Sequence, residues 1–448
     1  CSHSEALSRI DRFVCDIKET QFGDGLHIFG RKCEQMLPFE TASSELAEQK
    51  AIRNALSGKR ISAGPSGSPY RGRMDVLPSG RNLFATDPLS VPTRAAYSQG
   101  IKLAEEFIRR HLQDKGDWPS GVIVDLWGSA TMRTAGEEFA MALHLLGIKP
   151  VWADGSERVS GFEILPLITL DRPRIDVTLR VSGLFRDVFP TLSNLYQQAI
   201  DALSKREESS DWNPYTSGAE STRVYGPAPG SYGLGMGSAP EQLSDTGRQV
   251  AAEAWLEASS YAIKGEQIYQ DKKGLKDRVA KADSFVHLQD MPETDLLLSA
   301  DYAAHEAGFA AAKNSIGGNI SLYHLDNTDP ENPTSRTLTE EIARVVYARA
   351  CNPNWLAGMK RHGFRGAAEI SATLVHMAAF ANLADVVGSH LFDSYHDATL
   401  GNDDIVDFMS EYNPEALAAM RGCFEQLYHS GLWKTRRNFI LDDLGISA

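Results

Sequence analysis

An apolar run followed at once by a helical pattern places the strongest constraint on how this chain folds. The run GVIVDLWG (121–128) is short and apolar, as in a strand buried on both faces of a sheet. The segment TAGEEFAMALHLLG (134–147) has helical spacing and a closing glycine, and IKPVWA (148–153) begins another strand. Strand, helix and strand within about thirty residues predict a βαβ unit and therefore a parallel sheet.

A second strand and helix extend this pattern through RIDVTLRVSG (174–183) and LSNLYQQAIDALSKREE (192–208). The sequence therefore predicts a multi-domain α/β protein, with an open parallel α/β domain at 81–210 followed by mixed and mainly helical C-terminal regions. Ligands of such sheets bind beyond the carboxyl ends of the strands. Arg133 and Arg186 follow two of these ends, where an anion could meet a helix N-terminus. Surface salt bridges are the alternative for both arginines.

The other predicted boundaries follow composition and periodicity, and the length of 448 residues suggests about three domains. The segments are a helical segment with a glycine loop (1–60), a Gly/Pro/Ser linker (61–80), a Gly-rich loop (211–240), a mixed α/β region (241–334) and a helical C-terminal region (335–448). Apolar residues at helical spacing predict a helix near 4–20. Thr337 and Glu340 predict a capping box at the start of a later helix.

Charge and cysteine content limit the classes of function. The net charge of −14 argues against wholesale binding to nucleic acid or to an anionic membrane. The five cysteines are odd in number and form no C-x-x-C pair, which favours a reduced, cytoplasmic setting. No apolar run approaches the ~18 residues of a membrane span. The chain begins at Cys1 instead of Met, so we expect a piece of a longer protein.

Motifs of the common hydrolases are absent from the sequence, including G-x-x-x-x-G-K-[ST], H-E-x-x-H and G-x-S-x-G. Nucleotide hydrolysis by this chain is therefore not expected. Histidines near carboxylates remain: Glu19 and His27 around the glycine loop FGDGLHIFG, Asp301 with His305, and His324 with Asp326. Such pairs suit a divalent metal or proton acceptance, whereas turn formation, capping and core packing are the alternatives.

The spacing of two of these pairs predicts that their members share a face. His324 and Asp326 would face the same side of a strand, and Asp301 and His305 the same side of a helix. The segment RVYGPAPGSYGLGMGS (223–238) is rich in glycine and lacks the strand context of a dinucleotide fingerprint. It could lie flat against a planar ligand, or it could connect two domains.

Six long blocks carry a family resemblance. They are RFVCDIKETQFGDGLHIFGR, VLPSGRNLFATDPLSVPTRAA, VDLWGSATMRTAGEEFAMALHLLGIKPVW, RPRIDVTLRVSGLFRDVFP, RVYGPAPGSYGLGMGSAPE and NPNWLAGMKRHGFRGAAEI. In these blocks, over nearly its whole length, the chain resembles the C-terminal part of the large subunit of aerobic cobaltochelatase. That subunit is related to the porphyrin-binding large subunit of magnesium chelatase.

The resemblance implies an ATP-dependent metal chelatase that inserts Co2+ into hydrogenobyrinic acid a,c-diamide during cobalamin synthesis. Co2+ would be a substrate, whereas ATP and Mg2+ would be used by separate AAA+ and von Willebrand-type partner subunits and not bound by this chain. A magnesium-chelatase-type subunit acting on a porphyrin is one alternative. A non-catalytic tetrapyrrole carrier or scaffold is another.

The resemblance also assigns roles to residues. By motif, Glu19 and Asp326 would accept protons or deliver the metal, with His27 assisting, because carboxylates hold a divalent ion and can release it to ring nitrogens. Asp301 and His305 are further candidates for the metal. The ring carries several carboxylates, which suit the guanidinium fork. The candidate ring-binding residues are Arg81, Arg133, Arg186, Arg223 and Tyr232.

Overall fold

An eight-stranded sheet forms the centre of the computed structural model, which describes residues 3–19, 29–31, 42–65, 67, 69, 73–84, 87–217 and 222–445. The strand order is β12-β11-β10-β3-β6-β7-β8-β9. The parallel strands are β11 (Ser321–Asp326), β10 (Ser284–Gln289), β3 (Gly121–Leu126), β6 (Asp176–Val181) and β7 (Val224–Gly226). The antiparallel strands are β12 (Thr334–Thr337) at one edge, β9 (Gln267–Gln270) at the other edge, and β8 (Tyr261–Lys264) next to β9. The predicted α/β fold is confirmed.

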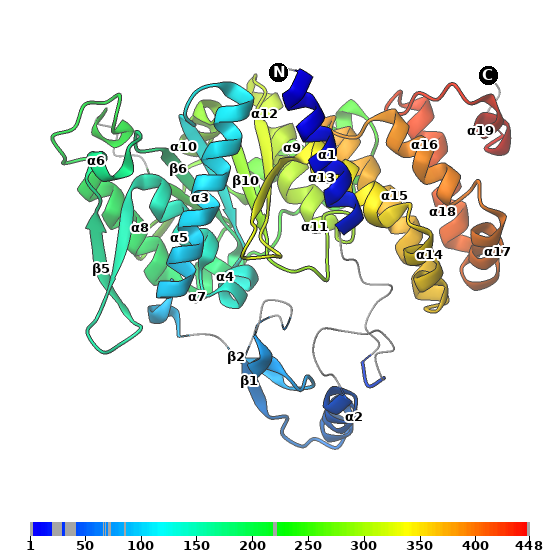
Figure 1. The fold of residues 1–448 in the computed structure, drawn as a ribbon, viewed down its shortest axis with the longest axis horizontal. Helices are drawn as coiled ribbons and strands as arrows, with labels where there is room; N and C mark the ends of the chain where they lie inside the picture. The colour runs from blue at the N-terminus through cyan, green and yellow to red at the C-terminus, as the bar shows by residue number, and fades with distance from the viewer. Residues whose placement is uncertain are drawn as a thin grey trace.

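Helices cover both faces of this sheet (Figure 1), which explains why its central strands are apolar. One face is covered by α3 (Arg94–Lys115), α5 (Glu137–Leu146) and α8 (Pro190–Leu203). The other face is covered by α9 (Asp245–Ala258), α10 (Lys272–Lys281), α12 (Gly308–Ile316) and α13 (Leu338–Val345). Neighbouring residues of β3 divide between the two cores, with Val122 and Val124 in one and Ile123 in the other.

The predicted βαβ unit is wrong in its second strand. Helix α5 forms as expected, but β4 (Ile148–Trp152) leaves the main sheet and pairs antiparallel with β5 (Val159–Ile164). The parallel neighbour of β3 is β6. Residues of β4 alternate between buried and exposed, and Pro150 donates no ladder hydrogen bond, so this segment suits a surface hairpin. The β6 residues are buried almost throughout.

The sheet also crosses the boundaries expected from the sequence. Strands β3 and β6 come from the 81–210 segment, whereas β10 and β11 come from the 241–334 segment. A strand buried on both faces has the same apolar composition whether its neighbours in the sheet are near or far in the sequence. Composition therefore did not reveal that segments 81–210 and 241–334 share one sheet. Helix α13 begins at the predicted capping box of Thr337 and Glu340.

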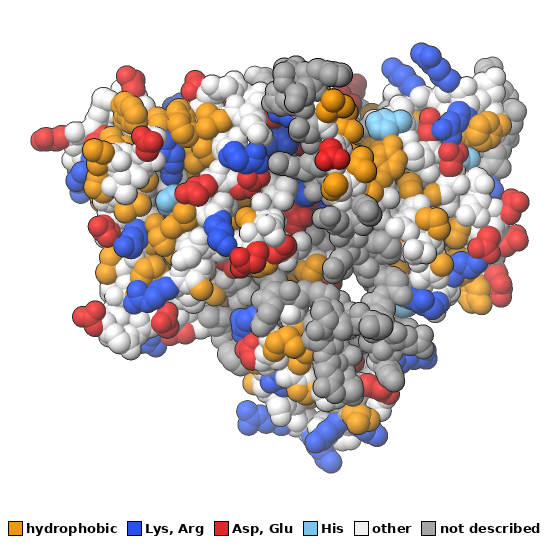
Figure 2. All heavy atoms as spheres, in the orientation of Figure 1, with side chains coloured by type: hydrophobic (Ala, Val, Ile, Leu, Met, Phe, Trp, Pro, Cys, Tyr) orange, Lys and Arg blue, Asp and Glu red, His pale blue; other side chains and the backbone are white. Residues whose placement is uncertain are grey.

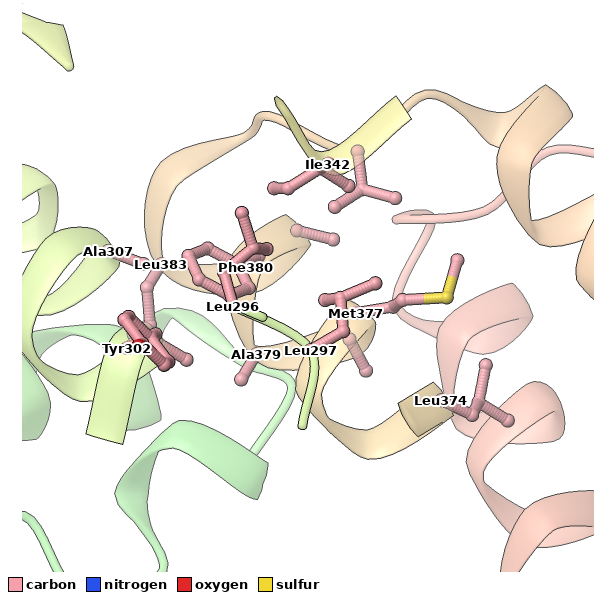
Figure 3. Packing of buried hydrophobic residues seen from close by; sticks show 14 of the residues in the cluster. Leu296, Leu297, Tyr302, Ala307, Ile342, Leu374, Met377, Ala379, Phe380 and Leu383 are labelled. Atoms are coloured by element: carbon pink, nitrogen blue, oxygen red, sulfur yellow. The ribbon is translucent and has the colours of Figure 1, made fainter. Parts of the chain in front are cut away.

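The C-terminal region is helical, as predicted. It contains α14 (Pro353–Lys360), α15 (Phe364–Ala384), α16 (Ser389–Ala398), α17 (Asp403–Tyr412), α18 (Pro414–His429) and α19 (Asn438–Asp443). Helix α15 is long and apolar enough to cross a membrane, but 72% of its most apolar window is buried and it contacts α14, α17 and α18. Figure 3 shows Leu374, Met377 and Phe380 of this helix packed with Ile342 and neighbouring apolar side chains. Helix α15 is therefore a core helix.

A small lobe faces the carboxyl edge of the sheet. Figure 1 places α2 (Ala42–Leu56), β1 (Ala63–Pro65) and β2 (Asn82–Phe84) below the side of the main body that carries α4 (Gly128–Thr134), α7 (Gly183–Val188) and α11 (Ala300–Tyr302). Buried Glu48 accepts hydrogen bonds from Ser79 Oγ and Gly30 N, each at 2.5 Å, so the predicted linker is partly an ordered element. Figure 2 shows basic side chains gathered at the outer end of the lobe. The exposed basic residues of α2 and of the short segment that follows it are Lys50, Arg53, Lys59 and Arg60.

Helix α1 (His3–Glu19) matches the helix predicted near 4–20 and contacts α13 (Figure 1). Its apolar stripe does not face a core, however. The exposed fractions of Leu7, Ile10 and Val14 are 55%, 60% and 56%. Helical spacing thus identified the helix but not the face that packs.

Candidate functional site

The strand order reverses direction between β3 and β10, which are neighbours in the sheet. From β3 the chain continues through α4 and α5 to β6 on one side, whereas from β10 it continues through α12 to β11 on the other. Helices α5 and α12 belong to different core clusters, on opposite faces of the sheet. A crevice forms at such a switch point, beyond the carboxyl ends of the strands, and ligands bind there.

Five buried polar side chains cross the sheet at this level. The register pairs Arg180 of β6 with Asp125 of β3, and Asp125 with His287 of β10. It also pairs His287 with His324 of β11, and His324 with Arg336 of β12. Buried charges are costly unless they are paired and hydrogen-bonded. This row therefore requires partners from the helices above it.

His305 is one of these partners and comes from the π-helical segment η6 (Ala303–Ala307). Its Nδ1 lies 2.7 Å from Asp125 Oδ2 and 3.0 Å from Arg180 Nη1. Trp127 Nε1 lies 2.8 Å from the same Asp125 oxygen and 3.2 Å from His305 Nδ1. The hydrogen bonds of the His305 side chain all involve Nδ1, so Nε2 has no partner among the residues that the structure describes. The side chain keeps an exposed fraction of 10%.

The protonation states favour His305 as an acceptor. Burial lowers the pKa of His305 below its ordinary value; Asp125 opposes this shift and Arg180 adds to it. Burial favours the neutral form of Asp125, but His305 and Arg180 outweigh it and hold the pKa of Asp125 well below its ordinary value. With its proton on Nδ1, donated to the Asp125 carboxylate as the nearest neighbour, the neutral imidazole of His305 offers the Nε2 lone pair, which suits proton transfer or metal contact.

His287 is the second imidazole that lies against Trp127 and Asp125. Its Nδ1 is 3.5 Å from Asp125 Oδ2 and has no hydrogen-bond partner among the described residues. The Trp127 ring centroid lies 4.6 Å from that of His287 and 4.9 Å from that of His305. Asp125 and Trp127 thus hold two imidazoles at the switch point.

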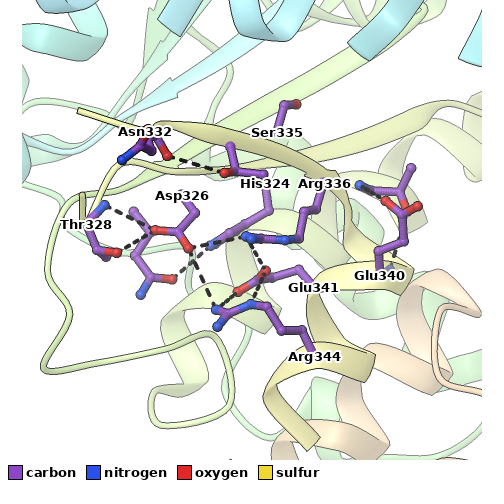
Figure 4. Close-up of polar contacts among 12 residues, drawn as sticks. His324, Asp326, Thr328, Asn332, Ser335, Arg336, Glu340, Glu341 and Arg344 are labelled. Atoms are coloured by element: carbon purple, nitrogen blue, oxygen red, sulfur yellow. Dashed lines mark hydrogen bonds and ion pairs between the residues drawn. The ribbon is translucent and has the colours of Figure 1, made fainter. Parts of the chain in front are cut away.

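A second charged group joins β11, β12 and α13 (Figure 4). Asp326 Oδ2 accepts from Arg336 Nη1 at 3.2 Å, and its Oδ1 accepts from Thr328 N and Oγ1 at 3.1 and 2.7 Å. Glu341 Oε2 accepts from Arg344 Nε at 2.9 Å and from Arg336 Nη1 at 3.3 Å. The negative charges of these two carboxylates are balanced by the positive charges of the two guanidinium groups. Asp326 therefore already serves as a turn-forming and ion-pairing residue, which was the alternative considered for it.

His324 is enclosed by its neighbours and differs from His305 in this respect. Its Nδ1 lies 3.0 Å from Glu306 Oε1 and its Nε2 lies 2.9 Å from Gln289 Oε1. Burial disfavours the charged ring, but Glu306 outweighs it and raises the pKa of His324. Because both nitrogens are occupied, His324 is a packed ion-pair partner, whereas His305 and His287 keep acceptor capacity.

The structure brings some of the predicted site residues together and separates others. His324 and Asp326 face the same side of β11, as predicted, and His305 joins the same face of the sheet through Asp125. Asp301 is exposed, whereas His305 is buried, because the helix becomes π-helical after Tyr302 and its spacing changes. The side chain of Glu19 and the whole of His27 lie outside the described residues, so their convergence on this site stays a prediction.

Arg133 and Arg186 follow β3 and β6 as expected, but each already has a carboxylate partner. Arg133 binds Asp290 through two hydrogen bonds of 2.7 and 2.8 Å. Arg186 Nε lies 2.7 Å from Asp187 Oδ1. Both arginines lie at the carboxyl edge of the sheet, and ring binding by them stays a prediction.

The other two arginines lie away from the switch point. Arg223 Nε donates at 2.8 Å to Asp176, the first residue of β6, and so lies toward the amino end of that strand. Arg81 donates to the backbone carbonyls of Asp75, Leu77 and Pro78 within the small lobe. These contacts assign both arginines a structural role, and the structure does not bring them to the imidazole pair.

Sequence reasoning missed the residues at the centre of this arrangement. Asp125 and Arg180 lie inside runs that were interpreted only as strands, and His287 lies in the mixed α/β region 241–334, where no strand was predicted around it. A signal was present, because a charge within an apolar parallel strand must be paired in the interior. Finding its partner required the tertiary structure. No group of three His, Cys, Asp or Glu side chains in the described part of the chain has an arrangement that could hold a metal ion.

Glu138 is a buried carboxyl group near this edge and leads to a pH prediction. It accepts from Thr131 Oγ1 at 2.7 Å and Thr134 Oγ1 at 2.9 Å, and no cation pairs with it among the described residues. Burial raises its pKa from 4.5 to about 7. The part of the folding stability that depends on Glu138 is therefore fully present below pH 4.5 and is lost as pH rises from 4.5 through 7, because the unfolded chain ionises first.

Glu138→Gln is expected to remove the loss of folding stability between pH 4.5 and 7. At pH 8 the variant should be more stable than the wild type by about 1–3 kcal/mol, and at pH 4.5 the difference should vanish. Urea unfolding at both pH values measures it, with the exposed Glu157→Gln as the control. Equal stability of Glu138→Gln and wild type at pH 8 would contradict the prediction.

Comparisons with known proteins agree with the resemblance in the sequence. Residues 32–440 match the family described as CobN/Magnesium Chelatase. The chain is 40% identical to the aerobic cobaltochelatase subunit CobN of Pseudomonas aeruginosa over 425 residues, which cover 90% of this chain and 34% of that protein. It is 27% identical to the chloroplastic magnesium-chelatase subunit ChlH of Oryza sativa over 419 residues, covering 90% of this chain and 30% of that protein.

A solved structure supports the same relationship. The catalytic subunit of cobaltochelatase from Mycobacterium tuberculosis superposes with a TM-score of 0.92 and 28% identity, covering 99% of this chain and 46% of that one. The chain spans about one third of the length of its CobN relatives. On the family match and on the identity to CobN subunits, the chain belongs to the CobN/magnesium chelatase family.

Proposed function

We propose that this chain is part of the large, tetrapyrrole-binding subunit of a cobaltochelatase, which inserts Co2+ into hydrogenobyrinic acid a,c-diamide in cobalamin biosynthesis. ATP would be hydrolysed by separate AAA+ partner subunits acting with a von Willebrand-type subunit. The compartment would be the cytoplasm, in keeping with the free thiols of Cys15, Cys351 and Cys423.

The observation that carries the proposal is the pair of imidazoles, His305 and His287, at the switch point of a sheet whose chain is 40% identical to cobaltochelatase subunits. The preference for cobalt rests on relatedness. CobN subunits are 40% identical to this chain, whereas the magnesium-chelatase subunits compared are 24–27% identical. The ligand types themselves do not select between the two metals.

Metal insertion requires proton acceptance. A ring N–H bond must break, with its electron pair staying on nitrogen to bind the incoming Co2+, and the ion must shed bound water. We assign the released proton to Nε2 of His305, because the carboxylates of the adjoining network are already paired with cations. Asp125 would then stabilise the imidazolium through Nδ1.

Glu19, His27 and Asp326 are further proposed participants in proton acceptance or metal delivery, and Asp301 is a further proposed contact for the metal. Asp326 is the last residue of β11, the strand next to the one that carries His287. The carboxyl end of α1, where Glu19 ends the helix, lies on the side of the body that faces the small lobe (Figure 1).

Metal and ring choice can be measured directly. The full-length protein, with the ATPase partners and ATP, is expected to insert Co2+ into hydrogenobyrinic acid a,c-diamide and to leave Mg2+ and protoporphyrin IX unreacted. Absorbance spectra of the metallated rings would follow all four combinations. Mg2+ insertion into the porphyrin would instead assign the magnesium branch, and ring binding without any insertion would assign a carrier.

A further inference from the structure

The glycine loop 227–237 leaves the carboxyl end of β7, and the main body holds it at several points. Arg186, with an exposed fraction of 4%, donates from Nη1 to the carbonyl oxygens of Pro227, Ala228 and Ser231 at 2.9, 2.5 and 3.3 Å. In each of these bonds the Arg186 guanidinium group donates to a backbone carbonyl of the loop. Arg186 therefore fixes the path of the loop.

The far half of the loop is fixed by burial. Leu234 and Met236 are buried in the core cluster that contains α9 and α12. A Cβ added at Gly308 would meet Met236 Cε, and Gly308 follows directly after the η6 segment that carries His305. The loop therefore packs against the same helix that supplies the acceptor imidazole.

One large side chain of the loop is held in solvent. Tyr232 has an exposed fraction of 64%, yet its hydroxyl donates to Asp187 Oδ2 at 2.5 Å and its ring lies 5.6 Å from the Arg186 guanidinium carbon. Gly183 allows this position, because a Cβ there would lie 2.7 Å from Tyr232 Cδ1. An exposed aromatic ring fixed by three neighbours has little conformational entropy left to lose on binding.

The backbone beside Tyr232 is also uncovered. Gly230, Gly233, Gly235 and Gly237 have φ values of 76°, 71°, 62° and 54°, and a Cβ at any of them would meet nothing within 4 Å. These positive φ angles favour glycine, and the absence of side chains leaves the peptide planes open to a flat ligand.

We infer that the 227–237 loop is a rigid platform for one face of a planar, conjugated macrocycle, with Tyr232 as its aromatic contact and Arg186 as the positioning residue beneath it. The inference rests on the proposed function and deepens it by naming where the ring lies. It also changes the role expected of Arg186, which holds the loop and does not bind a ring carboxylate.

Ring binding without metal, ATP or partners tests the platform. In the full-length protein, Tyr232→Ala is expected to raise the Kd for deuteroporphyrin IX, measured by fluorescence quenching, about tenfold. Tyr232→Phe, which keeps the ring, should change it less than about threefold. Tyr269→Ala removes an exposed tyrosine from β9 at the edge of the sheet and is the matched control. Unchanged affinity in Tyr232→Ala would overturn the inference.

Arg186→Lys separates positioning from direct binding, because lysine keeps the charge and loses the fork. If Arg186 positions the loop, the variant should weaken the binding of deuteroporphyrin IX and the binding of its dimethyl ester by the same factor. If only the affinity for deuteroporphyrin IX falls, and the affinity for the dimethyl ester does not, Arg186 binds the carboxylates directly and the positioning role is overturned. Because none of these measurements uses cobalt insertion, the platform and the proposed chelatase activity can fail independently.

Discussion

Replacement of His305 by Gln is expected to lower the rate of cobalt insertion by about 10²–10⁴-fold, the usual contribution of a positioned base. Glutamine approximates the size of the imidazole but cannot accept a proton at neutral pH. The described carboxylates around it are held in ion pairs, so they cannot readily substitute: Glu306 with His324, Glu341 with Arg344, and Asp326 with Arg336. His287 keeps an Nδ1 without a hydrogen-bond partner among the described residues.

Several measurements separate this role from a structural one. Affinity for the ring and the far-UV spectrum should be unchanged in His305→Gln, and its rate deficit should narrow as pH rises, because hydroxide can accept the ring proton. Asp125→Asn should lower the rate as well, since Nδ1 would lose its carboxylate. His390→Gln alters an exposed histidine of α16 and should leave the rate unchanged. Wild-type turnover by His305→Gln would remove this residue from the mechanism.

Replacement of Glu341 by Gln is expected to destabilise the fold by about 3–5 kcal/mol, as for other broken buried ion pairs. The change would leave Arg336 and Arg344, both buried, with Asp326 as the remaining carboxylate of this group. Denaturant unfolding at pH 7 measures the loss. Glu411→Gln, an exposed change on α17, is the control. A loss below about 1 kcal/mol would mean that the group contributes little to stability.

The stability of Glu341→Gln should also depend on pH differently from that of the wild type. Burial favours neutral Glu341, but Arg344 and Arg336 outweigh it and lower the pKa of Glu341 from 4.5 to about 2. Its contribution to stability is therefore present above pH 4.5 and is lost as pH falls toward 2. The wild type should lose stability over this window, and Glu341→Gln should lack that part of the acid dependence.

Local features were predictable because they depend on neighbours in the sequence. The apolar run of β3, the periodicity of α5 and α8, and the capping box at Thr337 and Glu340 each formed as expected. In these cases the hydrogen bonds and apolar spacing that define the element lie within a few residues. The same kind of reasoning placed His324 and Asp326 on one side of β11.

Contacts between distant segments were not predictable in this way. Strand β4 reads like a parallel strand but pairs outside the main sheet, and β10 joins β3 although 157 residues separate Asp290 from its partner Arg133 at that edge. Spacing also placed Asp301 beside His305, whereas the π-helical turn exposes one residue and buries the other. Which strand lies next to which depends on long-range packing, which a short window of sequence does not contain.

The sequence by itself determined the alternating strands and helices, the acidic balance and the blocks that resemble the cobaltochelatase large subunit. Only the tertiary structure decided that Asp125, Arg180, His287 and His305 meet, since they come from β3, β6, β10 and η6. The physical reason is that a buried charge is strongly destabilising unless its counter-charge is buried beside it, and that counter-charge lies on a different strand or helix.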